Sequence, residues 1–291
     1  MSIEKKDLNK NFITHCEIND LLCLTMLVYN YGKTFEFGKN QDVESFMNQI
    51  KDEPDKLDTL GLNQTRKEAF LHLCNGSPHG KILKFISNDD TDIQVGITKS
   101  EVQKRINVVF RGSESKSDWW YDLQIFKKEL ENNICVHVGF YKQLFSVYAE
   151  LEEYVLKNIE NNPDYEVYIT GHSLGAALAT LFGYLLSTKT NRKITIVSFA
   201  SPRVGNKEWK NNFESKENLI HYRVTNNRDI VTALPMWDYH HVGINVQLFE
   251  DCYKVHYNES YNKFWEYSVF RCFSPWDHDY YLYYKNLLKN V

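Results

Sequence analysis

A serine between two glycines stands in the middle of the chain, in the order Gly171, His172, Ser173, Leu174, Gly175. The apolar run before it is typical of a buried strand, and the small and apolar residues after it are typical of a helix. On a sharp turn between two such elements the serine backbone is strained, and flanking glycines remove β-carbons that would clash. The turn exposes the hydroxyl and points unpaired N–H groups of the helix start at any anion beside it. The pattern predicts a nucleophile, and the alternative is a tight turn whose serine only caps the helix.

A nucleophilic serine needs a base, and the base needs a carboxylate that orients it. When the nucleophile lies on a turn of this kind, the chain order is serine, acid, histidine. Asp229 follows Ser173 in that order and begins the loop after the apolar strand of YRVTNNRDIVTALP. Catalytic groups gather at such strand ends in open α/β sheets. We therefore expect Asp229 to be the acid, and an ordinary turn aspartate is the alternative.

The base must come from the histidines that follow Asp229, which are His240, His241, His256 and His278. His240 and His241 open a predicted strand, and His256 lies in a polar, aromatic loop without an accompanying motif. His278 stands in SPWDHDYYLYY, where a loop enters a final aromatic helix and an imidazole can hang over the sheet edge. The residues alone favour His278 and leave the other three open.

Strands and helices must alternate along the chain to position these residues. Helices are predicted over residues 20–31, where Asp20 is available as the cap, 141–160 and 174–186. Strand patterns occur in KILKFIS, IQVGITKS, RINVVF, CVHVGF, EVYITG, ITIVSFA, IHYRVTN and HVGINVQLF. Such alternation predicts an α/β fold, a mostly parallel central sheet with helices on both faces.

The domain organisation follows from the same patterns. We expect one domain over residues 1–291. Residues 1–75 would contribute an N-terminal helix and surface decoration, and residues 76–291 would form the catalytic core.

Composition argues against several classes of protein. The 291 residues carry a formal net charge of -4 with interleaved acidic and basic side chains, so no basic stripe suggests a nucleic-acid partner. The apolar run LLCLTMLVY is far shorter than the roughly 18 residues that a transmembrane span needs. The start, MSIEKKDLNKNFITH, lacks the apolar region of a secretory signal, so we expect a cytoplasmic protein. A secreted form whose leader has been removed is the alternative.

Metal chemistry is not expected. His240 and His241 lie near Asp238, but two adjacent histidines on a strand point to opposite faces. We predict no catalytic metal and no cofactor.

Six blocks of sequence carry a resemblance to a known family. The blocks occur in order over residues 80–285 and are VVFRGSESKSDWWYDL, VHVGF, YITGHSLGAALATL, FASPRVGN, RVTNNRDIVTALP and WDHDYYL. The chain resembles the fungal-type triacylglycerol lipases, the class 3 lipase family, whose fold is the α/β-hydrolase fold. Residues 1–70 match only loosely, through the first helix.

The resemblance implies a role for each site residue. Ser173 would be the nucleophile, Asp229 the orienting acid and His278 the general base, which agrees with the reading from the residues. Backbone N–H groups of Ser113 and Leu174 would form the oxyanion hole, with the Ser113 hydroxyl as a further donor. Two donors aimed at a developing oxyanion stabilise the transition state more than the ground state.

The segment after Ser113 resembles the lid of the family, at about residues 114–128, with Trp119 and Asp122 at matching positions. Its bulky apolar residues recur at i, i+1, i+4 and i+7, which makes one stripe on a short helix: Trp119, Trp120, Leu123 and Phe126. Such a helix would cover an acyl groove in water and roll open at a lipid surface. A helix packed permanently on the core is the alternative.

These expectations combine into a serine hydrolase that cleaves carboxylic esters of acylglycerols through an acyl-enzyme. Its expected partner is the lipid ester, met in transient contact with a lipid–water interface. A phospholipase A1 or a small-ester esterase on the same fold is the alternative among enzymes. A lipid-binding protein that keeps the scaffold without turnover is the alternative from another class.

Overall fold

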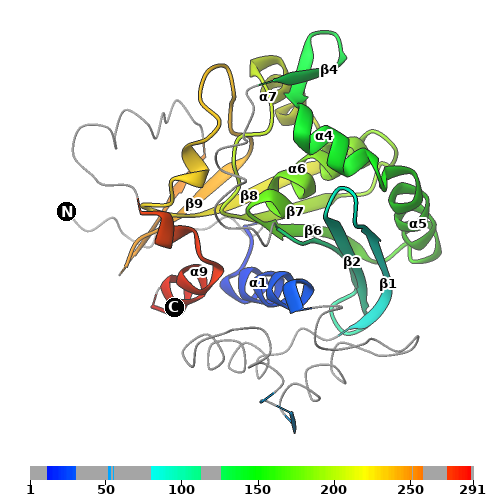
Figure 1. The fold of residues 1–291 in the computed structure, drawn as a ribbon. Coiled ribbons are helices and arrows are strands. Elements are labelled where there is room, and N and C mark those ends of the chain that lie inside the picture. The colour runs from blue at the N-terminus through cyan, green and yellow to red at the C-terminus, as the bar shows by residue number, and fades with distance from the viewer. Residues whose placement is uncertain are drawn as a thin grey trace.

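The computed structural model of the protein describes residues 12–30, 52–53, 55, 80–112, 126–250, 252–257 and 274–289. Within these residues an eight-stranded sheet forms the centre of the molecule (Figure 1). Its strands, in spatial order, are β1 (Lys81–Asn88), β2 (Ile93–Ser100), β3 (Arg105–Phe110), β6 (Glu166–His172), β7 (Ile194–Phe199), β8 (Leu219–Asn226), β9 (Ile244–Leu248) and β10 (Tyr253–His256). A separate hairpin pairs β4 (Lys127–Glu131) with β5 (Ile134–His137).

The five strands from β3 to β9 in this order run parallel, and the two edges are antiparallel. All residues of β3 and of β7 are buried, as a strand covered on both faces requires. The helices are α1 (His15–Asn30), α4 (Val138–Phe145), α5 (Tyr148–Asn161), α6 (Leu174–Ser187), α7 (Lys207–Glu214) and α9 (Tyr280–Lys289). The predicted fold class, a mostly parallel sheet covered on both faces, is confirmed.

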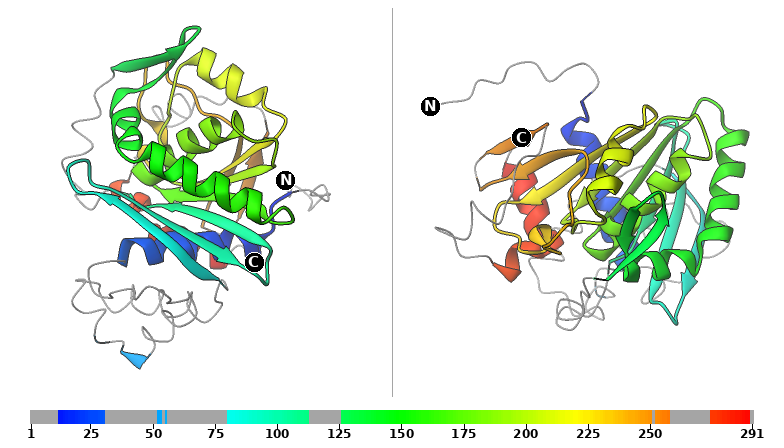
Figure 2. Two further views of the ribbon diagram at one scale, coloured as in Figure 1. Left: turned by 90° about the vertical axis from the view of Figure 1, so that its right-hand side faces the viewer. Right: turned by 90° about the horizontal axis from the view of Figure 1, so that it is seen from above.

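Two hydrophobic cores lie on opposite faces of the sheet. Helices α1 and α9 cover one face, and α4, α5 and α6 cover the other (Figures 1 and 2). Side chains alternate between the two cores along β3, because successive residues of a strand point to opposite faces. Val108 and Phe110 belong to the core under α6, whereas Val109 between them belongs to the core under α1.

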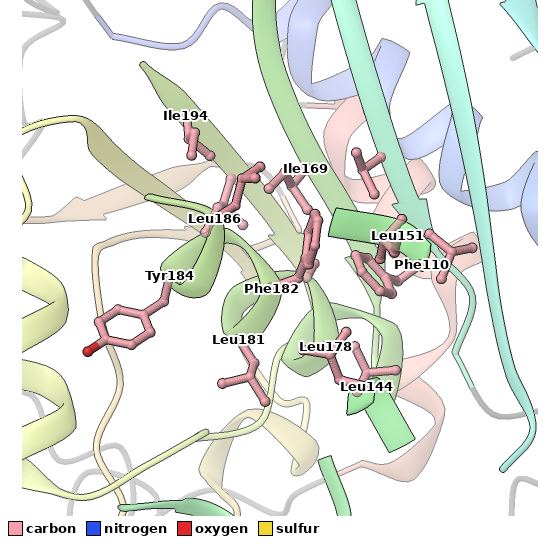
Figure 3. Close-up of a cluster of buried hydrophobic side chains, with 14 of the residues drawn as sticks. Phe110, Leu144, Leu151, Ile169, Leu178, Leu181, Phe182, Tyr184, Leu186 and Ile194 are labelled. Carbon is pink, nitrogen blue, oxygen red and sulfur yellow. The ribbon is translucent and has the colours of Figure 1, made fainter. Parts of the chain in front are cut away.

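The core under α6 is the larger of the two and holds this helix in place. Every residue of α6 except Leu185 is buried, which its run of small and apolar residues permits. Phe182 packs against Phe110 and Tyr148 at ring centroid distances of 5.7 and 6.2 Å. Figure 3 shows Phe182 and Leu186 of α6 directed at Ile169 and Ile194 of the underlying strands.

The core under α1 explains why this helix is apolar around most of its surface. Residues 21–28 of α1 are all buried. The helix begins earlier than predicted, and Asp20 lies inside it rather than at its cap. Thr14 and Glu17 form a reciprocal capping box instead: the Thr14 N–H donates to the Glu17 carboxylate at 2.7 Å, and the Glu17 N–H donates to the Thr14 hydroxyl at 3.2 Å. The sequence expectation overlooked this box because the apolar pattern starts only at Leu21.

Two expectations about the whole chain lie partly outside the described residues. The single domain over residues 1–291 stays a prediction, because residues 31–51 and 56–79 are not described. No helix in the described part of the chain combines the length and the apolarity needed to cross a membrane.

Replacing Phe182 by alanine tests the role of the core under α6. Its side chain is fully buried, so Phe182→Ala should lower the free energy of unfolding by about 3–5 kcal/mol, through lost burial and the cavity left behind. Urea denaturation measures the change. Val102→Ala is the control, because Val102 is 73% exposed and its loss should cost within about 0.5 kcal/mol. Equal losses in the two variants would contradict this account.

Candidate active site

Ser173 lies on the turn between β6 and α6 in a strained backbone conformation. Its φ of 59° and ψ of -123° fall in a region that L-residues rarely adopt, and strain of this kind collects at functional sites. The Ser173 N–H donates to the carbonyl of Phe199 on β7 at 2.9 Å, which ties the turn to the sheet. The predicted strand–serine–helix turn is therefore present.

The flanking glycines are required by close backbone contacts. A β-carbon on Gly171 would lie 2.5 Å from the carbonyl carbon of Gly175. A β-carbon on Gly175 would lie 2.4 Å from the carbonyl oxygen of Phe110. At this turn α6 therefore packs so closely against the end of β3 that positions 171 and 175 have no room for a side chain.

Three residues from different elements meet at the turn. His278, at the end of the short helix η3 (Pro275–His278), places Nε2 2.7 Å from the Ser173 hydroxyl. Its Nδ1 lies 3.1 Å from each carboxylate oxygen of Asp229, in the loop after β8. Because an ionised carboxylate only accepts hydrogen bonds, Nδ1 carries the proton and Nε2 is free to accept from the serine hydroxyl. This is the arrangement of a nucleophile, a general base and an orienting acid.

The other three candidate histidines lie elsewhere. His241 bonds through Nε2 to the carbonyl of Thr232 at 2.6 Å, and His256 to the side chain of Gln247 at 3.1 Å. His240 lies 3.7 Å from the Asp238 carboxylate. Of the four histidines, only His278 is brought to Ser173.

Asp229 is fully buried and has hydrogen-bond donors beyond His278. The Val231 N–H donates to Oδ1 at 2.9 Å, and the Tyr283 hydroxyl donates to Oδ2 at 2.6 Å. The Ser274 N–H donates to the carbonyl of Arg228 at 3.1 Å, which holds the segment before His278 beside Asp229. The sequence contains no signal for Tyr283, because nothing in the spacing of its aromatic cluster distinguishes one tyrosine from the next.

His172 links the turn to helix α1 and to the histidine segment. Its Nε2 lies 2.8 Å from the carbonyl oxygen of His278, and its Nδ1 lies 3.0 Å from the Tyr29 hydroxyl. Since a carbonyl only accepts, Nε2 donates to it and Nδ1 accepts from Tyr29. The Tyr29 oxygen also occupies the space above Gly112, where a β-carbon would lie 2.0 Å away. The sequence identified His172 as part of the turn but contained no signal for Tyr29, which comes from a helix 143 residues away.

The predicted oxyanion hole is described only in part. Leu174 is the first residue of α6, and the first N–H groups of a helix have no partner within it. Ser113 lies outside the described residues, as do residues 114–125 of the predicted lid, with Trp119, Trp120, Asp122 and Leu123. Their roles stay predictions.

A second serine–histidine pair lies in the core and shows what the first one needs. The Ser198 hydroxyl is 2.8 Å from Nε2 of His221, and both residues are buried between β7 and β8. Complete burial is the main cause that lowers the pKa of His221 well below its usual value, and the positive charge of Arg223 lowers it further. With no carboxylate hydrogen-bonded to it, this imidazole is not set up to take a proton.

A metal site is not found within the described residues. In that part of the chain no group of three or more His, Cys, Asp or Glu side chains could hold a metal ion.

Sequence comparison relates the chain to lipases. Residues 107–239 match the family described as lipase (class 3). A lipase of Rhizomucor miehei is 32% identical over 168 residues, which are 56% of this chain and 46% of that protein. A secreted mono- and diacylglycerol lipase 1 of Fusarium solani is 32% identical over 157 residues, 53% of this chain and 46% of that protein. The chain thus spans about half the length of these curated relatives.

Solved structures of lipases also resemble this chain in fold. The triacylglyceride lipase of Rhizomucor miehei superposes with a TM-score of 0.64 at 27% identity, covering 70% of this chain and 81% of that one. A triacylglycerol lipase described as having a serine protease triad superposes with a TM-score of 0.65 at 28% identity, covering 71% and 82%. The predicted α/β-hydrolase fold and the resemblance to fungal lipases are confirmed.

Substitution of Gly175 tests the close approach at the turn. The added methyl group of Gly175→Ala would meet backbone atoms of Phe110 and Arg111 that cannot turn away, so the free energy of unfolding should fall by about 1–3 kcal/mol or more. Gly96→Ala is the matched control, since its β-carbon would meet only a methyl group of Val28 at an ordinary 3.7 Å. Chemical denaturation of both variants measures the difference, and equal stability would show that the turn does not need Gly175.

Proposed function

We propose, from the match of residues 107–239 to the class 3 lipase family, that this chain hydrolyses carboxylic esters of acylglycerols through an acyl-enzyme on Ser173. The observation that carries the proposal is the continuous hydrogen-bonded series from the Ser173 hydroxyl through His278 to the buried Asp229. The strained turn and the helix start beside Ser173 add support. The substrate class rests on the relatives, whose names are lipase and mono- and diacylglycerol lipase.

The proposed reaction follows from the positions of these groups. As Ser173 Oγ attacks the ester carbonyl carbon, its proton moves to Nε2 of His278, 2.7 Å away. Asp229 holds the Nδ1 proton and stabilises the imidazolium that forms. The imidazolium then gives its proton to the departing alcohol, leaving an acyl-serine. Water, deprotonated by the same imidazole, attacks that acyl group and releases the fatty acid while the proton returns to Ser173.

The developing oxyanion needs donors on the side of the carbonyl away from His278. The Leu174 N–H is proposed as one donor and Ser113 as the other, the second through its backbone N–H and its hydroxyl. Preorganised donors of this kind typically contribute about 10²–10³-fold each to kcat.

Localisation stays a prediction. The cytoplasmic expectation rests on the first residues of the chain, whereas the Fusarium solani relative is named as secreted. That name supports the secreted alternative for this chain.

Replacing Ser173 tests the proposed function directly. Ser173→Ala should lower kcat for tributyrin by at least about 10⁴-fold, because the nucleophile is lost. Ser198→Ala is the matched control: it removes a buried serine that also bonds to a histidine, and it should keep activity. Near-normal turnover by Ser173→Ala would rule out the mechanism, and an inactive wild type would favour the lipid-binding alternative.

The same assay separates the proposed activity from its nearest alternatives. Tributyrin is followed as its concentration crosses the solubility limit, and phosphatidylcholine is tested beside it. A jump in rate when droplets form supports a lidded lipase, whereas saturation below the limit indicates a small-ester esterase. Faster cleavage of phosphatidylcholine than of tributyrin would point to a phospholipase A1.

The pH dependence tests the role of the imidazole. The base must be neutral to accept the serine proton. We therefore expect kcat/KM to reach a plateau at higher pH and to fall, by about tenfold for each pH unit, once the pH is low enough to protonate the imidazole. Steady-state rates on p-nitrophenyl butyrate from pH 5 to 8 measure the profile. A flat profile over this range would argue against His278 as the base.

A further inference from the structure

Tyr283 bridges the acid of the site and the strand that carries it. This residue of α9 is completely buried. Its hydroxyl lies 2.9 Å from the backbone nitrogen of Asn226 on β8 and 2.6 Å from Oδ2 of Asp229. Because a backbone N–H can only donate, the hydroxyl accepts from Asn226 and its own proton points at the carboxylate. The direction of both hydrogen bonds is thereby determined.

The ring of Tyr283 packs against two other rings. It meets the His172 ring edge-on at 6.0 Å and the Phe199 ring at 6.5 Å. Burial is the main cause that raises the pKa of Tyr283 well above its usual value, and the negative charge of Asp229 raises it further. The hydroxyl therefore keeps its proton over the range in which the enzyme would work.

We propose that Tyr283 is a positioning residue that sets how strongly Asp229 holds the catalytic imidazole. The inference rests on the proposed function, since it concerns the same reaction. Oδ2 of Asp229 is shared between the Tyr283 hydroxyl and Nδ1 of His278, both of which donate to it. The hydroxyl stabilises the buried carboxylate as an anion and restrains its position beside the imidazole. It also draws charge from that carboxylate and so limits how tightly the imidazolium is held.

Loss of the hydroxyl should have two effects on catalysis. Without the hydroxyl, the Asp229 carboxylate would interact more strongly with the Nδ1 proton of His278. The His278 imidazole would then become protonated at higher pH. The carboxylate would also lose one of its supports against rotation, which would disturb the alignment of the base. Both effects act on the proton transfer and neither acts on substrate binding, because the hydroxyl that is lost is linked to Ser173 through Asp229 and His278.

Several other titratable or charged groups lie near Asp229 and His278 in the fold or next to them in the chain. They must stay constant when the variants are compared. They come from α1, β6, the loop after β8, η3 and the residues next to it: Tyr29, His172, Arg228, Asp277, Asp279 and Tyr280. None of these residues is substituted in the variants at position 283.

The test compares Tyr283→Phe with the wild type on p-nitrophenyl butyrate, a soluble ester, from pH 5 to 9. We expect kcat to fall by about 10-fold, as for a lost hydrogen bond to a charged group, with KM within about twofold. The acidic limb of kcat/KM should move to higher pH by about 0.5–1 unit. NMR titration of the His278 ring protons should show the same displacement without turnover.

Tyr184→Phe is the matched control. Tyr184 is also buried, and its hydroxyl donates to Oδ1 of Asn212 at 2.8 Å, between α6 and α7. This variant loses a buried tyrosine hydrogen bond away from Asp229, so its thermal stability should fall while its acidic limb stays in place. An acidic limb of Tyr283→Phe that coincides with that of the wild type would overturn the proposal, as would an equal displacement in Tyr184→Phe.

A second variant decides the matter where Tyr283→Phe does not fold. Placing 3-fluorotyrosine at position 283 keeps the shape of the ring and makes the hydroxyl a stronger donor. The acidic limb should then move to lower pH, and an unchanged or opposite displacement would refute the inference. Activity that survives Ser173→Ala would instead overturn the proposed function, so the two failures are distinguishable.

Discussion

The strained backbone at Ser173 is the constraint on which the rest of the site depends. A positive φ at a serine persists only where the surrounding structure fixes the backbone in that conformation. Here β6 is hydrogen-bonded on both sides and α6 is buried along almost its whole length. Relaxing the turn would pull the helix from its core, which would cost more than the strain. The glycines at 171 and 175 follow from the same constraint, because the turn brings two backbones into direct contact.

A buried carboxylate imposes the second requirement. Asp229 has no exposed surface, and a charge in that position must be surrounded by donors. Its donors in the described part of the chain include the adjacent backbone at Val231, the imidazole of His278 and the hydroxyl of Tyr283. Ser173 approaches from the face covered by α6, whereas Tyr283 and Tyr29 belong to α9 and α1 on the other face. The site therefore depends on both layers of helices, although Ser173 belongs to one.

Comparison of the two serine–histidine pairs shows which features make a site reactive. Ser198 and His221 approach as closely as Ser173 and His278, at 2.8 and 2.7 Å. Of these two pairs, only Ser173 and His278 have an aspartate behind the imidazole and lie at the end of a strand, beside the start of a helix. A serine next to a histidine is therefore insufficient, and the charge behind the base distinguishes the two.

The sequence by itself determined the elements and the residue types of the site. Strand and helix patterns follow from burial of one or both faces, and the glycine–serine–glycine turn follows from local sterics, so both were readable from neighbouring residues. The start of α1 was misplaced because the box of Thr14 and Glu17 lies outside the apolar pattern. Only the tertiary structure decided which histidine reaches Ser173 and that Tyr283 and Tyr29 join the network. Those contacts connect residues 54 to 143 positions apart, and such distances depend on how the elements pack, which local patterns do not encode.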